Sequence, residues 1–543
     1  MSLNEIDEKR ETISKYLTSL NRSHNSQLPI NKVIPDILYH IFSFAVFGSS
    51  VPATTSLYIS HVCHHWRISS LEWGTLWGFL DFSSRKISAL FLKRSKDAPI
   101  TLAWSTRYHR PLFNRLIPGH TNFDHSMKKY FESSVYLFPR LSSLILHLSF
   151  SEFKEVHESF QNSGPLRLQS LDIGIYHIPI DPHDPNTIWF QYLLADMTYL
   201  RELKLRELSL PWIIPPHQKL THLSIIHPRI LPTSAQLLTF LSHCPALVEL
   251  ELNLINDNPR DLQTTAAQQN QNVPELVEFD KLDFPNLTKL DFCATDSSSY
   301  KCIQEVSSHF GNLGTLSSFW VKYEVMPPME TPPTDIFELV PNGALSNFRH
   351  QRFLSINLHR STGNFLILGG DDSACIPRVR RKGHYPIHQN LKFFPLSLIG
   401  HGQPGQLFDH SPIIDLIHEM PEIRHLHLIS SGWELLTSWD IHLSTIFPHL
   451  VTLDLSDQHH PTRDCDDCLR ALADSSGLNL KTLILKRVRF DSSLLPHVAL
   501  KTGIKVLELA DDCFVEPEIL DILRERGVRV VSFDEELSTI SGI

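Results

Sequence analysis

Three stretches near the C-terminal end of the sequence share one pattern: LVTLDL at residues 450–455, LKTLIL at 480–485 and IKVLEL at 504–509. Each has apolar residues at its first, fourth and sixth positions, and mostly polar residues between them. This spacing is typical of a short β-strand with one buried side. Because the same frame recurs along the chain, it indicates a repeat architecture in which neighbouring copies bury each other's apolar side chains.

The same frame occurs through most of the sequence, and segments with helical patterns, such as Ser234–Cys244 and Glu516–Arg526, separate its copies. We therefore expect each copy to form a strand, a turn and a helix, with the strands stacked in parallel. The predicted fold class is α/β: an irregular leucine-rich-repeat solenoid with a parallel inner sheet and outer helices, preceded by a small all-helical domain. The copies begin at Leu141, Leu168, Leu200, Leu220, Leu247, Leu287, Leu316, Phe353, Leu391, Ile423, Leu450, Leu480, Ile504 and Val528.

The spacing between copies varies, so extra residues must leave the repeat array as loops. The stretch at residues 257–275 is rich in Gln and Asn, a composition that is typical of a solvated loop. The expected loop insertions lie near residues 257–275, 326–334 and 369–389. The expected parts of the chain are an N-terminal helix and linker (1–26), a helical block (27–82) and the repeat array (83–543).

The N-terminal helix has apolar residues at the a and d positions of a heptad, interrupted by one arginine. These residues are Leu3, Ile6, Arg10, Ile13, Leu17 and Leu20. The stretch is shorter than three heptads, which is too short for a stable isolated coiled coil. We expect this helix to dock on a neighbouring element, and the alternative is an oligomerisation helix.

The helical block contains motifs that point to a known family. Residues 33–42 (VIPDILYHIF) resemble the opening of an F-box, residues 62–67 (VCHHWR) resemble its second signature, and Leu76-Trp77 resembles its closing pair. In this sequence Val33 and Ile34 stand where the family usually has Leu and Pro. The resemblance covers about fifty residues, and the rest of the chain is similar to fungal F-box proteins only through its repeat pattern.

The resemblance implies a non-catalytic adaptor. An F-box docks on the Skp adaptor, and through it on a cullin–RING ubiquitin ligase, while the solenoid captures a protein substrate. A block this small also cannot bury all of its apolar residues internally. The alternative is a leucine-rich-repeat scaffold that does not engage a ligase. The residues expected to bind the adaptor are Ile34, Pro35, Leu38, Ile41, Phe42, Trp66, Leu76 and Trp77.

The residues between the apolar positions of the frame should point to the opposite face of the strands. Their mixed charge favours a polar protein or peptide as the partner. The alternative is an ordinary solvated sheet face without a ligand. The candidate substrate-binding residues are Lys204, Arg206, Glu251, Asp291, His425, His427 and Asp454.

The composition argues against several other classes of protein. The net charge of −10 argues against a nucleic-acid partner. Eight cysteines in 543 residues do not form a disulfide framework, and no apolar run is long enough for a signal peptide or a membrane span. We expect a cytoplasmic or nuclear protein that is monomeric outside its complex.

Motifs for catalysis and metal binding are weak. Cys465 and Cys468 have a zinc-like spacing, but they share a helical face with Leu469 and Leu472, which favours core packing. No nucleophile elbow, phosphate loop or zincin pair is present in the sequence. We therefore expect no catalytic residues, no bound metal and no cofactor. The basic run Arg378–Lys382 is predicted to be a solvated loop, and the alternative is a nuclear-import signal or a contact with an acidic partner.

Overall fold

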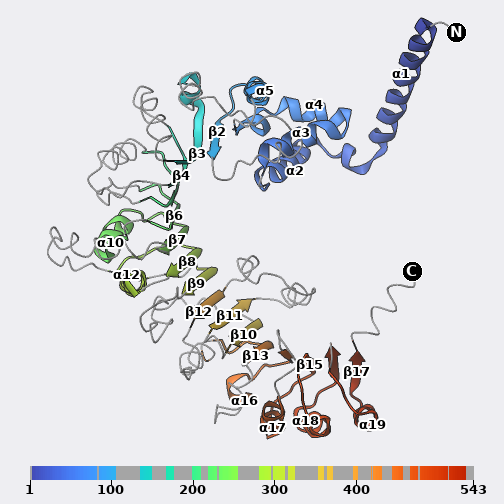
Figure 1. Cartoon of the computed structure of the whole chain (residues 1–543), viewed down its shortest axis with the longest axis vertical. Coiled ribbons are helices and arrows are strands. Elements are labelled where there is room, and N and C mark those ends of the chain that lie inside the picture. Colours follow the sequence, from blue (N-terminus) through green and yellow to red (C-terminus); the bar gives the residue numbers. More distant parts are fainter. Residues whose placement is uncertain are drawn as a thin grey trace. The chain divides into compact units, whose positions relative to one another are not determined.

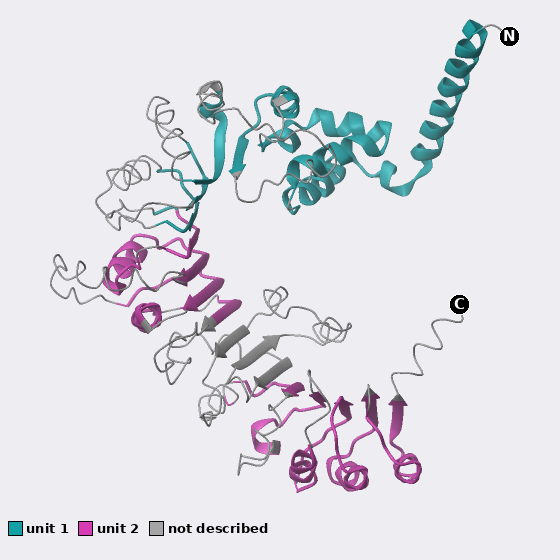
Figure 2. Ribbon diagram, viewed as in Figure 1, with its two compact units in different colours: residues 1–219 teal, residues 220–543 magenta. Residues whose placement is uncertain are grey.

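The computed structural model divides the chain into two compact units, residues 1–219 and 220–543 (Figures 1 and 2). The residues that the structure describes are 3–49, 51–81, 85–105, 135–149, 167–176, 198–208, 218–228, 231–254, 281–294, 297–311, 313, 316–323, 353–359, 364–370, 396–401, 418, 420–430, 443–456, 465–474, 477–510 and 513–532. The expected loop insertions near 257–275, 326–334 and 369–389 lie largely or wholly outside these residues, as does Arg378–Lys382.

The first unit begins with helices, and prolines start two of them. Pro35 and Pro52 occupy the first positions of their helices, where the missing N–H costs no hydrogen bond. Among the described residues of this unit, the helices are α1 (Leu3–Gln27), α2 (Pro35–Phe47), α3 (Pro52–Val62), α4 (His64–Glu72) and α5 (Arg85–Ser95). The 3-10 turns in the same residues are η1 (Pro29–Lys32), η2 (Gly74–Trp77) and η3 (Val135–Arg140).

The core of the helical block is formed by side chains from α2, α3 and η2. Leu38, Phe42 and Val46 recur every four residues on α2 and are fully buried. Leu76 and Trp77 of η2 are buried as well. The Ser56 hydroxyl of α3 donates a hydrogen bond of 2.7 Å to the Leu76 carbonyl. The block therefore has a small, continuous core of its own.

Trp77 connects the helical block to helix α5. Its indole N–H donates a 2.7 Å hydrogen bond to the Ser70 carbonyl, and its ring lies edge-on to Phe91 of α5 at 4.9 Å. A Cβ atom at Gly78 would lie 2.5 Å from the Pro99 carbonyl oxygen, so only glycine permits this approach. Strand β1 (Phe79–Leu80) comes directly after Gly78 and already belongs to the sheet, before the expected end of the block at residue 82.

The strands of the first unit pair in parallel and in chain order. Each strand after the second coincides with a copy of the repeat frame. After β1, the strands of this unit are β2 (Ile100–Ser105), β3 (Leu141–Ser149), β4 (Ser170–Tyr176) and β5 (Glu202–Arg206).

The second unit continues the pattern of strands and helices. In Figure 1, α17, α18 and α19 lie on one side of the strands that they follow. Its strands are β6 (His222–Ile226), β7 (Glu249–Leu254), β8 (Lys289–Ala294), β9 (Ser318–Tyr323), β10 (Phe353–His359), β11 (Asn364–Gly370), β12 (Leu396–His401), β13 (His425–Ser430), β14 (Thr452–Ser456), β15 (Thr482–Lys486), β16 (Val506–Ala510) and β17 (Arg529–Ser532). The helices and the 3-10 turn in its described residues are α10 (Ser234–Ser242), α12 (Ser297–Ser308), α16 (Leu443–Ile446), α17 (Asp466–Asp474), η10 (Ser492–Leu494), α18 (Leu495–Thr502) and α19 (Pro517–Glu525).

The expected all-parallel sheet is wrong at one place in the second unit. Strand β11 runs antiparallel to both of its neighbours, β10 and β12. Strand β12 then pairs with β9, and β10 pairs with β13, both in parallel. The chain reverses between β10 and β11, so the copies near 353 and 391 do not simply follow each other. Of the copy expected at Leu391, only its sixth position, Leu396, lies in a described strand.

The apolar positions of the frame line up from strand to strand. Leu453, Leu483 and Leu507 are direct partners across β14, β15 and β16, and none is more than 2% exposed. Leu250 pairs in the same way with Leu223 and Leu290 in the β6–β8 part of the sheet. The α/β class and the buried leucine ladder predicted from the frame are thus confirmed in the described residues.

The turn after a strand repeats as well, a feature that the apolar pattern alone does not contain. Glu207, His227 and Arg487 have φ values of 53°, 51° and 53°. Each comes two residues after the sixth position of its frame, so the chain leaves these strands through the same left-handed turn. Non-glycine side chains tolerate this conformation at a modest cost.

Candidate protein-binding surfaces

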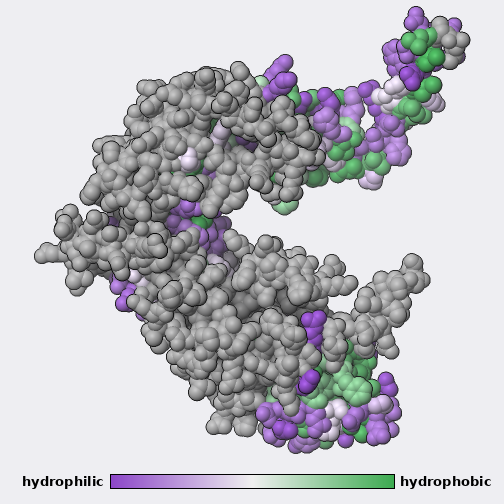
Figure 3. Space-filling view, in the orientation of Figure 1, coloured by the Kyte–Doolittle hydropathy of each residue, from purple (hydrophilic) through white to green (hydrophobic). Residues whose placement is uncertain are grey.

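Helix α2 is apolar on two adjoining faces, and only one of them is buried. Leu38, Phe42 and Val46 fill the core, whereas Ile37 and Phe44 are 51% and 83% exposed. Apolar residues at the surface of the helical block are visible in Figure 3. We call the exposed set the α2 apolar face: Ile34, Ile37, Ile41 and Phe44. A helix that is apolar around most of its circumference normally has neighbours on each apolar side.

The residues expected to bind an adaptor separate into three groups. Ile34, Pro35 and Ile41 are exposed. Trp66 is half-buried. The four others, Leu38, Phe42, Leu76 and Trp77, are at most 1% exposed and belong to the core. Their burial corrects the expectation that these four contact a partner directly. Leu38 and Phe42 belong to the buried i, i+4, i+8 row of α2, and Leu76 and Trp77 are the buried side chains of η2.

Trp66 holds the start of α4 against the 3-10 turn η1. Its indole N–H donates a 2.7 Å hydrogen bond to Asn31 Oδ1, and its ring lies 4.8 Å from that of Phe42. The backbone N–H of Trp66 also donates to the sulfur of Cys63, which caps the helix. These contacts show that Trp66 stabilises the helical block itself.

Two exposed aromatic residues of α2, Phe44 and Phe47, were not among the expected contact residues. They are 83% and 56% exposed. A strict use of the helical period could have found the second face, because Ile34, Ile37, Ile41 and Phe44 follow i, i+3, i+7, i+10 spacing. Exposed apolar side chains of α3 in the same block are Tyr58 and Val62.

The polar positions of the repeat frame form the second candidate surface. In the first unit, Asp172 of β4 lies between His147 and Arg206. Its Oδ1 is 2.9 Å from His147 Nε2 and 3.3 Å from Arg206 Nε. Burial favours the neutral form of Asp172, but the hydrogen bond and charge of His147 and the charge of Arg206 outweigh it, so the pKa of this carboxyl is lowered.

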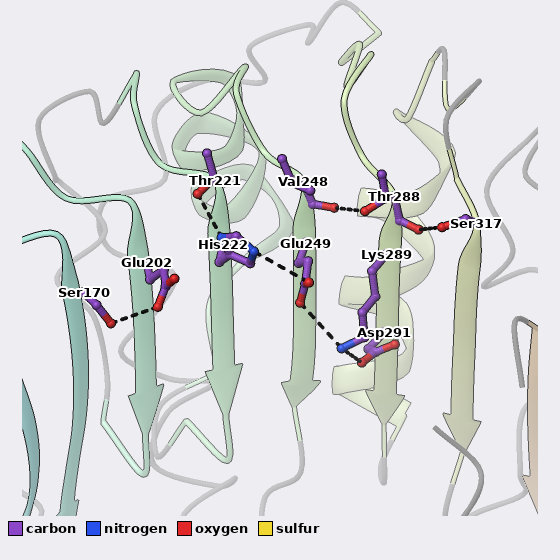
Figure 4. A network of polar contacts seen from close by, with 10 residues as sticks. All are labelled: Ser170, Glu202, Thr221, His222, Val248, Glu249, Thr288, Lys289, Asp291 and Ser317. Carbon is purple, nitrogen blue, oxygen red and sulfur yellow. Dashed lines mark hydrogen bonds and ion pairs between the residues drawn. The ribbon is translucent and has the colours of Figure 1, made fainter. Parts of the chain in front are cut away.

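In the second unit, an acidic group surrounds one lysine on β7 and β8 (Figure 4). Lys289 Nζ lies 3.1 Å from Asp291 Oδ2 and 3.8 Å from Glu249 Oε2. His222 Nε2 approaches the other oxygen of Glu249 at 3.6 Å. Burial opposes the charge of Lys289, but Asp291, Glu249 and Glu251 outweigh it and raise its pKa.

A third polar group lies on β13, β14 and β15. Lys486 Nζ is 2.7 Å from Asp454 Oδ2, and His427 Nε2 is 2.8 Å from the Ser456 hydroxyl. His427 and Asp454 are 7% and 6% exposed. Lys486 and Asp454 have opposite charges, and their ion pair joins neighbouring strands of the sheet.

The seven candidate substrate-binding residues do not converge on one site. Each lies at the third, fifth or seventh position of its frame, so all share the polar face of their strands, as predicted. Lys204 is exposed and Arg206, Glu251 and His425 are half-buried, whereas Asp291, His427 and Asp454 are buried. His147, Asp172 and Lys289 were missed, although they occupy the same frame positions.

The cysteine pair of α17 is part of the core. Cys465 and Cys468 are 1% and 0% exposed, and burial raises the pKa of the Cys468 thiol far above its ordinary value. The packing prediction is confirmed. Within the described parts of the chain, no group of three or more His, Cys, Asp or Glu side chains could hold a metal ion. Among the same residues, no helix is both long and apolar enough to cross a bilayer.

Comparison with known proteins gives no further assignment: no family model matches this sequence, and no curated protein matches it. The two surfaces therefore have to be interpreted from their own chemistry.

Proposed function

We propose that this chain is the substrate receptor of a Skp–cullin–F-box ubiquitin ligase. In this proposal the helical block is an F-box that docks on the Skp adaptor, and the strands and helices after it form a leucine-rich-repeat solenoid that holds a protein substrate. The chain itself carries out no chemistry. The observation that supports the proposal best is the α2 apolar face, which lies beside a core that is already complete.

The exposed apolar side chains of α2 leave free energy of burial unused in the isolated chain. Burial of a large aliphatic or aromatic side chain contributes about 1.5–3 kcal/mol relative to leaving it in water. Ile34, Ile37 and Ile41 are 59%, 51% and 40% exposed, so each still has apolar surface to bury. An apolar face of this kind on a small helical domain is typical of a docking surface for another protein.

Phe44 is the expected anchor of the contact. It is 83% exposed, and aromatic side chains that enter a partner's pocket often contribute 2 kcal/mol or more, roughly, to binding. Three members of the α2 apolar face, Ile34, Ile37 and Ile41, lie within the F-box-like motif of residues 33–42.

The polar strand face supports the second half of the proposal. Paired charges such as Lys486 and Asp454 hold strands together, while more exposed groups such as Lys204 and Glu249 remain within reach of a partner. A face with both signs of charge favours recognition of a polar protein segment over a purely apolar one. The buried leucine ladder keeps this face rigid.

The proposal is tested with the full-length chain and a purified Skp adaptor. Ile41→Arg and Phe44→Glu should abolish adaptor binding, measured by calorimetry. Lys86→Glu is the matched control, because it introduces a glutamate, as Phe44→Glu does, at an exposed position of α5, outside helix α2. Circular dichroism and thermal unfolding must show that all variants stay folded.

Two outcomes decide against the ligase function. If the folded wild-type chain fails to bind the adaptor at micromolar concentration, a repeat scaffold without ligase engagement takes its place. Equal loss of binding in the Phe44→Glu and Lys86→Glu variants would show that the contact does not use the α2 apolar face.

A further inference from the structure

Helix α1 carries an apolar stripe that nothing in the described chain covers. The helix has 25 residues and none of them is buried. Ile13, Leu17 and Leu20 are 59%, 52% and 48% exposed, and Leu3 is 76% exposed. The expectation that this helix docks on a neighbouring element of the same chain is therefore not met in the described residues.

The stripe has the spacing of a short two-stranded coiled coil. At under three heptads it is too short for a permanent pair, so the pairing is expected to be reversible. Leu3, Ile6, Ile13, Leu17 and Leu20 occupy alternating a and d positions, and Arg10 occupies the remaining a position. A helix with such a stripe gains stability when a second helix covers it, because packing of the apolar face stabilises short helices more than intrinsic propensity does.

The charges along α1 suggest that the second helix is another copy of α1. Residues 3–13 contain Glu5, Asp7, Glu8 and Glu11 against Lys9 and Arg10, a net charge of −2. Residues 14–27 contain Lys15 and Arg22 and no acidic residue, a net charge of +2. The helix is therefore electrostatically complementary to its own antiparallel copy.

Arg10 favours the same orientation. In a parallel, in-register pair, the two Arg10 side chains would face each other in one a layer, and their charges would repel. In an antiparallel pair that places Leu3 opposite Leu20, Ile6 faces Leu17 and Arg10 faces Ile13 of the other copy. Every layer then contains at least one aliphatic side chain.

We propose that α1 is a self-association helix, through which two copies of this chain pair in antiparallel orientation along the stripe from Leu3 to Leu20. The dimer replaces the expected monomer and does not depend on the ligase function. It would give each assembly two α2 apolar faces and two polar strand faces.

The test measures the mass of the full-length chain by sedimentation equilibrium over a range of micromolar concentrations. Wild type should show a monomer–dimer equilibrium, and Leu17→Glu should be monomeric throughout. Ser19→Glu is the matched control, because it adds the same charge to an exposed position on the side of the helix away from the stripe. Arg10→Leu should tighten the dimer by about tenfold or more, since a polar residue in the seam lowers stability.

Each of the following results would contradict the proposal. Wild type that is monomeric at every concentration excludes self-association. Equal behaviour of the Leu17→Glu and Ser19→Glu variants would show that any association uses another surface. If wild type is monomeric and Leu17→Glu loses adaptor binding, the stripe of α1 binds the adaptor and not a second copy of the chain. Chains labelled with pyrene at the N-terminal amine should give no excimer fluorescence, because an antiparallel pair holds these ends apart, and excimer emission would refute this orientation.

Discussion

Truncation of Leu483 to alanine tests whether the leucine ladder holds the C-terminal part of the second unit together. Leu483 is 0% exposed, and its direct strand partners Leu453 and Leu507 are 1% and 2% exposed. A Leu→Ala change in a core costs about 2–5 kcal/mol, through lost burial and the cavity that remains. Backbone pairing fixes the strands on both sides, so the cavity can collapse little, and we expect about 3–5 kcal/mol.

Hydrogen exchange measured by mass spectrometry is the suitable assay, because a chain with two compact units need not unfold in one step. Each loss of about 1.4 kcal/mol accelerates exchange through the opened state tenfold, so amides of β14–β16 should exchange at least about a hundredfold faster. Thr482→Ala, on the other face of the same strand, should change the rates little. Unchanged rates in the Leu483→Ala variant, or equal acceleration in helices α2–α4, would refute the ladder as the local source of stability.

Two further predictions concern the polar groups and the thiols. The lowered pKa of Asp172 means that its ionised form stabilises the folded chain above its unfolded pKa, and that this contribution disappears as the pH falls through the folded value. Thermal melts of wild type should therefore lose more stability on acidification than those of Asp172→Asn, and parallel pH profiles would contradict this. Cys465 and Cys468 should resist alkylation by iodoacetamide until the chain unfolds, and elemental analysis should find no stoichiometric zinc; about one zinc per chain that is lost in the Cys465→Ser/Cys468→Ser variant would contradict core packing.

The repeat frame predicted more of the fold than any other feature of the sequence. Its apolar positions identify the strands around Leu250, Leu453 and Leu483, because a side chain that alternates with polar neighbours on a strand must face the core. The frame could not predict the reversal at β11, because strand direction is set by the connections and not by the alternation itself. The repeated left-handed turn at Glu207 and Arg487 was equally invisible, since neither residue type signals a positive φ.

The polar strand face shows a second limit of the frame. The alternation places Asp291 and Lys204 on the same side of their strands, yet Asp291 is buried and Lys204 is exposed. The difference comes from the neighbours of each residue, since Asp291 has Lys289 within 3.1 Å. Frame position therefore predicts the face of a residue, whereas its availability to a partner depends on pairs that the sequence pattern does not specify.

Helix α2 explains why sequence alone could not separate core from docking surface. Leu38 and Ile37 are neighbours of the same chemical class, and both suit an apolar contact. The helical period places them about 100° apart, but it does not say which direction leads to the interior of the block. The contacts of η2 decide this, because Leu76 and Trp77 complete the core on the side of Leu38 and Phe42. Ile37, Ile41 and Phe44 are left exposed, and a decisive test of docking has to change these residues rather than the buried members of the same motif.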